Sequence, residues 1–154
     1  MAMRLESPSF QDGAAIPSGH ACDGDDLSPA LLWSGLPRDC RSLAIVVEDP
    51  DAPRGTWHHW GVFDIPPTET GLPEGFPTTA RVGSCRQATN DFGRTGYGGP
   101  CPPRGHGAHR YRFRLFALSV ERLALPNQPT CPELKAAMAR HALEEAVLTG
   151  LYER

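Results

Sequence analysis

The hydrophobic residues of this chain occur mostly in short runs that glycine and proline separate. Three runs have the length and composition of β-strands: residues 43–47 ("LAIVV"), 59–65 ("HWGVFDI") and 111–118 ("YRFRLFAL"). The first run is apolar at every position, which is typical of a strand covered on both faces. Sixteen glycines and sixteen prolines interrupt the chain. The pattern predicts a mostly β protein, a sandwich or barrel of short strands.

One segment near the C-terminus has the features of a helix. In "TCPELKAAMARHALEEAVLTG" (residues 130–150), Thr130 and Glu133 have the spacing of a capping box, and Gly150 is a natural stop. The apolar residues of this segment would lie on two sides of a helix: Leu134, Met138 and Leu148 on one, Leu143 and Val147 on the other. We expect a helix packed against the sandwich, with His141 inside it. Without a repeat or a linker, residues 1–154 are expected to form one domain.

The charge and the cysteines narrow the class of protein. A formal net charge of -3 and a pI near 6.0 provide no positive field for nucleic acid. The start lacks the layout of a signal peptide, and no run of roughly 18 apolar residues occurs. We therefore expect a cytoplasmic protein that is not membrane-integral. Five scattered cysteines without a CxxC spacing predict reduced thiols, not a zinc ribbon or a disulfide framework.

A first window of unusual chemistry is "DPDAPRGTWHHWGVFDIP", residues 49–66. If residues 57–65 are extended, successive side chains point to opposite faces. The alternation would place Trp57, His59, Phe63 and Ile65 on one face, and His58 and Trp60 on the other. Neighbouring histidines on a strand cannot easily bind one metal together, so only one of the two should face a ligand.

A second window covers residues 99–118. Alternation predicts one face with His109, Tyr111, Phe113 and Leu115, and an opposite face with Arg110, Arg112 and Arg114, solvated or paired with acids such as Asp49, Asp51 or Asp64. The preceding loop, "RTGYGGPCPPRGHG" (94–107), combines glycines, which let backbone amides approach a ligand, with stiffening prolines. Such a loop suits an anion, although a tight connection without a ligand has the same composition.

Together, "DPDAPRGTWHHW" (49–60) and "GPCPPRGHGAHRY" (99–111) resemble the two signatures of the phosphatidylethanolamine-binding protein family, which includes Raf kinase inhibitor proteins. The stretches "CDGDDLSPALLWSGLP" (22–37) and "DFGRTGYGGP" (91–100) are similar to its compact bacterial and archaeal branch. The resemblance runs from about Phe10 to the C-terminus. It implies an antiparallel β-sandwich with a C-terminal helix and a small pocket for phosphate-like anions.

Carried over residue by residue, the resemblance assigns eight residues to that pocket: Asp49, Pro53, Trp57, His59, Pro102, Pro103, His109 and Tyr111. Tyr152 is a looser match to an aromatic residue contributed by the C-terminus. The chain lacks the longer insertion and the extra C-terminal length of vertebrate members, so a kinase partner is not expected. The resemblance leaves any other protein partner, and the choice between monomer and homodimer, open.

The residue types suggest how the pocket would work. Histidine has an ordinary pKa near 6.5, so His59 and His109 could become cationic donors when an anion arrives. Tyr111 could donate its hydroxyl, and Asp49 could orient a histidine. The expected ligand is phosphate, a phospholipid headgroup or a phosphorylated group, and the expected role is regulatory or inhibitory. No catalytic residue, cofactor or metal is predicted.

Two rival functions use the same residues. A metal-binding protein could use Asp49, His59 and His109 as ligands if they converge. A hydrolase could use Cys101 as a nucleophile, with His109 or His59 as its base and the loop amides as an oxyanion hole. The alternative for Cys101 is a purely structural role, as a small residue that fills space in the packing.

Overall fold

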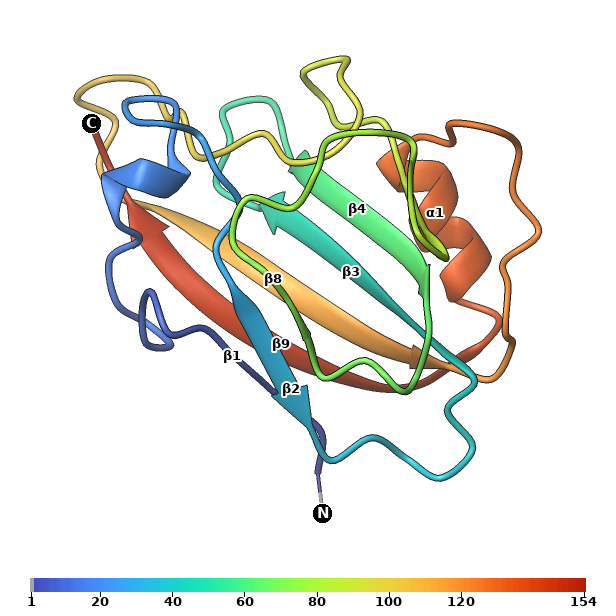
Figure 1. Cartoon of the computed structure of the whole chain (residues 1–154). Helices are drawn as coiled ribbons and strands as arrows, with labels where there is room; N and C mark the ends of the chain where they lie inside the picture. Colours follow the sequence, from blue (N-terminus) through green and yellow to red (C-terminus); the bar gives the residue numbers. More distant parts are fainter. Residues whose placement is uncertain (1) are drawn as a thin grey trace.

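The computed structural model describes residues 2–154. They form two antiparallel sheets and a single α-helix, connected by turns and loops (Figure 1). The smaller sheet has the strand order β1-β2-β5, and the larger has the order β6-β7-β4-β3-β8-β9. The strands are β1 (Arg4–Glu6), β2 (Leu31–Ser34), β3 (Ser42–Asp49), β4 (Trp57–Ile65), β5 (Gly71–Leu72), β6 (Arg81–Val82), β7 (Cys85–Gln87), β8 (His109–Leu118) and β9 (Ala142–Tyr152). The predicted mostly β, sandwich-type fold is confirmed.

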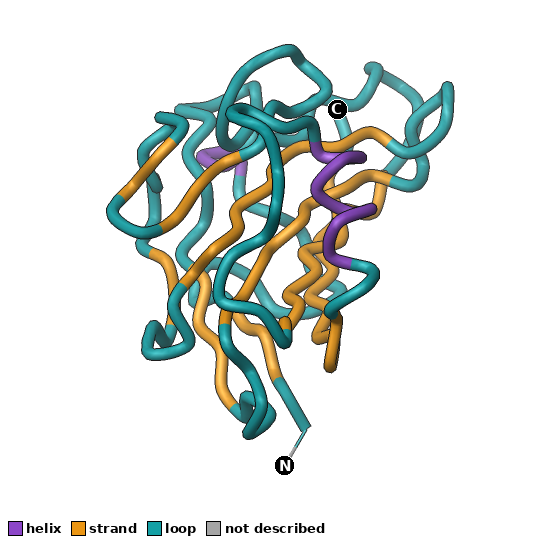
Figure 2. The backbone as a smooth tube through the Cα atoms, turned by 90° about the vertical axis from the view of Figure 1, so that its right-hand side faces the viewer, coloured by secondary structure: helices purple, strands orange, loops and turns teal. Residues whose placement is uncertain are grey.

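The larger sheet is covered on both faces. Within β3, Leu43, Ile45 and Val47 belong to the core between the two sheets. Ala44 and Val46 belong to a second core, together with residues of the helix α1 (Cys131–Met138). Figure 2 shows α1 in purple against one side of the strands. The fully apolar run of β3 is therefore explained as predicted, because both of its faces are buried.

The helix begins where the sequence predicts but ends much earlier. Thr130 and Glu133 form the capping box, with the Glu133 N–H donating to Thr130 Oγ1 over 3.2 Å and the Thr130 N–H donating to Glu133 Oε1 over 2.9 Å. The predicted continuation to Gly150 is wrong, because residues 142–152 form β9 along the whole length of β8. This pairing outweighs the local helix propensity. His141 consequently lies in the turn before β9, and Leu143 and Val147 are exposed strand residues.

Two register shifts in β4 change which side chains share a face. Glu48 pairs with His58 and Val47 with Trp60, so His59 is an extra residue in the strand. At such a bulge the alternation is interrupted. Trp60 therefore joins the core between the sheets instead of lying on the His58 side. A second shift near Asp64 places Phe63 in the core beside α1, which also differs from the prediction.

A disulfide joins Cys22 to Cys101, 79 residues away along the chain. For these two cysteines the prediction of reduced thiols is wrong; Cys40, Cys85 and Cys131 are free. The pairing follows from loop packing, since the backbone N–H of Cys22 donates to the carbonyl of Pro100 over 3.0 Å. Sequence spacing alone could not reveal it.

Candidate functional site

Strand ends and loops surround a cavity of about 220 Å³. Its lining residues are Asp49, Ala52, Pro53, Trp57, His59, Phe92, Cys101, Pro102, Pro103, His109 and Tyr111. All eight residues that the resemblance assigns to a pocket are among them, and Ala52, Phe92 and Cys101 are additions. The fold thus brings the two sequence windows together, while their binding of a ligand stays a prediction. A larger groove of about 690 Å³ runs along β1 and β9, but no histidine lines it.

Antiparallel pairing places the key side chains at the same end of three neighbouring central strands of the larger sheet. Asp49 ends β3, Trp57 begins β4 opposite it, and His109 begins β8 on the other side of β3. The turn after β3 is fixed by the Asp49 side chain, whose Oδ1 accepts the backbone N–H of Asp51 over 2.7 Å. Aspartate commonly closes a turn in this way.

Asp49, His109 and His106 form a hydrogen-bonded chain beside the cavity. His109 Nδ1 lies 2.7 Å from Asp49 Oδ2, and because a carboxylate only accepts, this ring nitrogen carries a proton. Asp49 therefore orients His109. His109 Nε2 lies 2.6 Å from Nδ1 of His106, a partner that the sequence does not reveal. His109 can donate from Nε2 to a ligand only if His106 moves aside.

His59 presents its other ring nitrogen to the cavity. Its Nδ1 donates to the carbonyl of Gly98 over 2.7 Å, which leaves Nε2 without a protein partner. Burial lowers the pKa of His59, so the imidazole is neutral near pH 7 and Nε2 is an acceptor. The ring meets those of Phe92 and Tyr111 edge to face, at centroid distances of 5.4 and 5.2 Å.

The hydroxyl of Tyr111 is a buried group without a hydrogen-bond partner, the only such side-chain atom in residues 2–154. Burial raises the pKa of Tyr111 strongly, and the Asp49 carboxylate raises it further, since it lies near the hydroxyl although the geometry between them is not that of a hydrogen bond. The hydroxyl therefore stays protonated and can donate. A buried polar group that lacks a partner is uncommon and calls for an explanation.

The second acid of the turn is held away from the cavity. Asp51 binds the Arg110 guanidinium with both oxygens, over 2.9 Å to Nη2 and 3.0 Å to Nε. The hydrogen bond from Arg110 lowers the pKa of Asp51 to about 2. This is one of the acid pairings expected for the arginine face of β8. It leaves Asp49 as the carboxylate that lines the cavity.

The rim of the cavity is held by the C-terminus and by the loop that carries Cys22. Tyr152 pairs with His109 across β8 and β9, but its hydroxyl donates to Asp23 Oδ2 over 2.6 Å. Arg154 Nε donates to the carbonyl of Pro102 over 2.8 Å. Tyr152 therefore braces the rim, and it is not among the residues that line the cavity.

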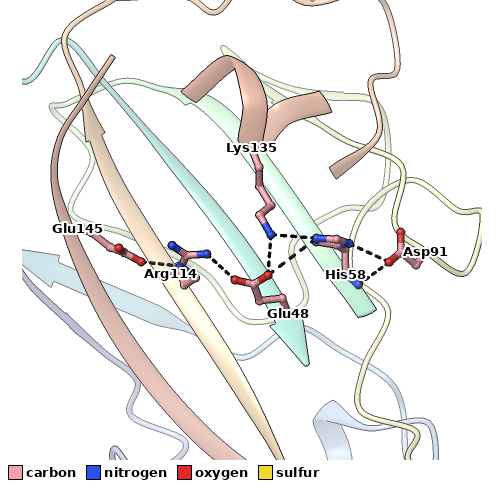
Figure 3. Close-up of polar contacts among 6 residues, drawn as sticks. All are labelled: Glu48, His58, Asp91, Arg114, Lys135 and Glu145. Carbon is pink, nitrogen blue, oxygen red and sulfur yellow. Dashed lines mark hydrogen bonds and ion pairs between the residues drawn. The ribbon is translucent and has the colours of Figure 1, made fainter. Parts of the chain in front are cut away.

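Six side chains form a polar network between α1 and the larger sheet: Glu48, His58, Asp91, Arg114, Lys135 and Glu145 (Figure 3). Lys135 of α1 donates to Glu48 Oε2 over 2.8 Å and contacts His58 Nε2 over 3.2 Å. His58 Nδ1 donates to Asp91 over 2.9 Å, and Arg114 binds the second oxygen of Glu48. Burial alone would raise the pKa of Glu48, but the two cations hold it below its ordinary value.

This network mirrors the cavity residue by residue. Glu48 precedes Asp49, His58 precedes His59, and Asp91 precedes Phe92. In each pair the first residue belongs to the network and the second lines the cavity. For Glu48 and Asp49 the arrangement follows from strand geometry, since successive side chains of a strand point to opposite faces. Asp91 and Phe92 lie in a turn, where the hydrogen bonds between Asp91 and His58 fix the position of the loop. The sequence alone gives little sign of this network, because the residues next to His58 along the chain, Trp57 and His59, are not acidic.

The two rival sites are not supported by this geometry. Within residues 2–154, no three His, Cys, Asp or Glu side chains converge in a manner that could hold a metal ion. His109 has both ring nitrogens engaged, by Asp49 and His106. Cys101 is bonded to Cys22, so in this form it has no thiol to act as a nucleophile.

Comparisons with known proteins cover nearly the whole chain. Residues 6–153 match the profile of a family described as phosphatidylethanolamine-binding protein. A UPF0098 protein of Aquifex aeolicus is 47% identical over 152 residues, covering 99% of this chain and 89% of that relative. A UPF0098 protein of Methanothermobacter thermautotrophicus is 47% identical over 154 residues and 99% of both chains. The crystal structure of Escherichia coli YbcL, described as a new member of the mammalian PEBP family, matches with a TM-score of 0.94 at 32% identity, covering 100% of this chain and 99% of that one.

Proposed function

Because the chain belongs to the phosphatidylethanolamine-binding protein family, we propose that its cavity binds a small anion that contains a phosphate group. The observation that carries this proposal is the unpartnered hydroxyl of Tyr111, a buried donor in a cavity that His59 also lines. A phosphate oxygen would satisfy that donor, and a hydrogen bond to a charged acceptor is stronger than one to a neutral acceptor.

The protonation state of His59 determines whether a proton must be taken up when the anion binds. Its Nε2 is an acceptor while the ring is neutral, so it repels an unprotonated phosphate oxygen. Binding therefore needs one more proton, either on the imidazole or on the ligand. We expect affinity to rise as the pH falls from 7.5 to 6.0, and to fall as salt screens the interaction. Trp57, Phe92 and the rim prolines limit the access of water, which strengthens the remaining polar contacts.

The role that we infer is regulatory: occupancy of the cavity by a free phosphate compound, a phospholipid headgroup or a phosphorylated group would control a partner enzyme. None of the helices in residues 2–154 has both the length and the apolar character that crossing a membrane requires. The cytoplasmic location expected from the sequence stays a prediction. The Cys22–Cys101 disulfide favours an oxidising compartment instead.

Titration calorimetry with inorganic phosphate and with O-phosphorylethanolamine tests the proposal at pH 6.0 and 7.5. We expect binding by the wild-type protein to be tighter at pH 6.0, and to be lost in His59→Ala. His141→Ala is a matched control, since His141 lies in the turn before β9 and does not line the cavity. Absence of heat with both ligands at both pH values would remove the proposed function.

A further inference from the structure

The disulfide lies at the cavity and is open to solvent. Cys101 lines the cavity, and both Cys22 and Cys101 are exposed residues. Exposed disulfides are generally the ones that exchange with thiols in solution. We propose that Cys22–Cys101 is a reversible thiol–disulfide exchange site, at which Cys101 takes up a low-molecular-weight thiol as a mixed disulfide over the mouth of the cavity.

The other cysteines are unsuited to this chemistry. Cys85 and Cys131 are buried, and burial raises the pKa of Cys85 to about 11 and that of Cys131 to about 12. Cys40 is half-buried, burial raises the pKa of its thiol, and its Sγ donates to the carbonyl of Ser42. Because the thiolate is the reacting form, exchange is confined to the exposed pair.

The rim has hydrogen bonds that do not depend on the disulfide. The Gly99 N–H donates to Asp26 Oδ1 over 2.8 Å, and the Tyr97 hydroxyl donates to the carbonyl of His20 over 2.6 Å. On the other side of Cys101, Arg154 holds the carbonyl of Pro102. Opening the S–S bond therefore releases two thiols on loops that these contacts keep in place, so both redox states are compatible with the fold.

The exchange needs only a thiol and its disulfide as co-reactants. A thiolate such as that of glutathione attacks one sulfur of Cys22–Cys101; the S–S bond breaks, and its electron pair passes to the leaving cysteine, which takes a proton from water. A second thiol completes the reduction of the protein. In the reverse direction, the Cys101 thiolate attacks oxidised glutathione, bonds to one of its sulfurs and releases glutathione as a thiolate.

Local charge favours Cys101 over Cys22 as the carrier of the adduct. Cys22 is followed by three acids, Asp23, Asp25 and Asp26, whose carboxylates together disfavour a thiolate and an anionic disulfide. Cys101 is instead followed by Arg104, and Arg154 donates to the carbonyl of the adjacent Pro102. Both arginines also pair with Asp23, so Asp25 and Asp26 supply the remaining negative charge beside Cys22. An adduct there would cover the cavity and exclude phosphate. This last consequence rests on the proposed anion-binding function, whereas the exchange itself does not.

Two variants trap the adduct before it is resolved. Cys22→Ser leaves Cys101 free, and Cys101→Ser leaves Cys22 free. Each folded variant is incubated with oxidised glutathione, and the modified cysteine is identified by peptide mass spectrometry. We expect Cys101 to be modified several-fold faster than Cys22, with Cys40, Cys85 and Cys131 unmodified as internal controls. In the wild type, reduced glutathione should open the disulfide while circular dichroism remains that of the folded protein.

Phosphate calorimetry then separates the two claims. Unmodified Cys22→Ser should bind phosphate, and its glutathione adduct should not. Equal or faster modification of Cys22, or reduction of the wild type only on unfolding, would overturn the exchange site. Unchanged phosphate binding by the Cys101 adduct would overturn its blocking effect. If Cys101 is modified as expected but no form binds phosphate, the exchange site stands and the anion-binding function fails.

Discussion

His58 and Asp91 are joined by three hydrogen bonds. The backbone N–H and Nδ1 of His58 both donate to Asp91 Oδ2, over 2.7 and 2.9 Å, and the backbone N–H of Asp91 donates to the carbonyl of His58 over 2.9 Å. The next residues along the chain, His59 and Phe92, meet edge to face in the wall of the cavity. A pair on one face of the sheet therefore sets the geometry of a pair on the other.

Removing the Asp91 carboxylate should weaken phosphate binding, although Asp91 itself does not line the cavity. In Asp91→Ala, the loop that carries Phe92 loses two of its three hydrogen bonds to His58, so the cavity wall is less well fixed. We expect about a tenfold loss of affinity, equivalent to ~1.4 kcal/mol, by calorimetry. Asp25→Ala is the control, because Asp25 is exposed and contacts neither His58 nor the cavity. An unchanged phosphate affinity in Asp91→Ala would show that the hydrogen bonds between His58 and Asp91 have no influence on the cavity.

The same network connects the helix to the sheet through Lys135, the only lysine in the chain. A compact ammonium can contact Glu48 and His58 together, which suits this position better than a planar guanidinium. In Lys135→Met, Glu48 loses one of its two cations. We expect the free energy of unfolding to fall by about 1–3 kcal/mol at pH 7, measured by urea denaturation.

The pH dependence of that loss follows from the pKa of Glu48. Because its pKa is lowered in the folded state, the carboxylate contributes stability above its ordinary pKa of 4.5, and this contribution is lost as the pH falls through the lowered value. The difference between wild type and Lys135→Met should therefore shrink below about pH 4. Arg140→Met, in the exposed turn after α1, should show neither effect. A difference that stays constant with pH would contradict the assignment to Glu48.

Much of the fold follows from local patterns, but the exceptions have physical causes. The burial of β3 is readable because its run is apolar at every position, and the two faces of β8 are readable because its buried and more exposed residues alternate. Two shifts in the register of β4 displace Trp60 and Phe63, and no local signal marks them. The C-terminal segment has helix-forming residues at 139–146, yet Ala146 and Leu148 are buried in a strand because β8 offers a partner along its whole length.

For the candidate site, the sequence identifies many of the residues that line the cavity, but it does not reveal the contacts among them. The motif resemblance identifies eight residues that line the cavity, yet it misses Phe92, which is brought there by Asp91 and His58. It also misses His106, whose contact with His109 depends on the shape of a glycine-rich loop. The Cys22–Cys101 pair is 79 residues apart, so only the packed loops reveal it. Contacts between distant segments are set by tertiary packing, which a single sequence does not display.

Anion binding should be coupled to uptake of a proton by His59. Burial lowers its pKa below the ordinary 6.5, so at pH 6.5 more than half of the free protein holds a neutral imidazole, and an anion favours the charged form. Sulfate serves as the ligand, because unlike phosphate it does not titrate in this range. Calorimetry in two buffers of different ionisation enthalpy should show net proton uptake in the wild type. In His59→Gln, which keeps a donor that cannot titrate, the uptake should fall; uptake that persists unchanged would assign the proton elsewhere.

The disulfide should stabilise the fold, in addition to its proposed role as an exchange site at the cavity. It closes a loop between residues 79 apart in sequence, and a loop of that length constrains the unfolded chain substantially. We expect Cys22→Ser/Cys101→Ser to lower the free energy of unfolding by roughly 2–4 kcal/mol, measured by urea denaturation. Cys40→Ser, which removes a free thiol, is the comparison. Equal stability of wild type and double variant would mean that the native loops confine the chain without the bond.

Removing the Tyr111 hydroxyl should separate binding from stability. Because this group is buried without a partner, Tyr111→Phe should leave the melting temperature of the ligand-free protein unchanged or slightly raised. Phosphate affinity should nevertheless fall about tenfold, since a hydrogen bond to a charged acceptor is lost. The comparison is Tyr97→Phe: the Tyr97 hydroxyl donates to the carbonyl of His20 over 2.6 Å and does not line the cavity, so this change should cost about 1 kcal/mol of stability and weaken binding less than Tyr111→Phe does. If Tyr111→Phe instead destabilises the protein and binds phosphate normally, its hydroxyl has a structural partner and is not the ligand donor.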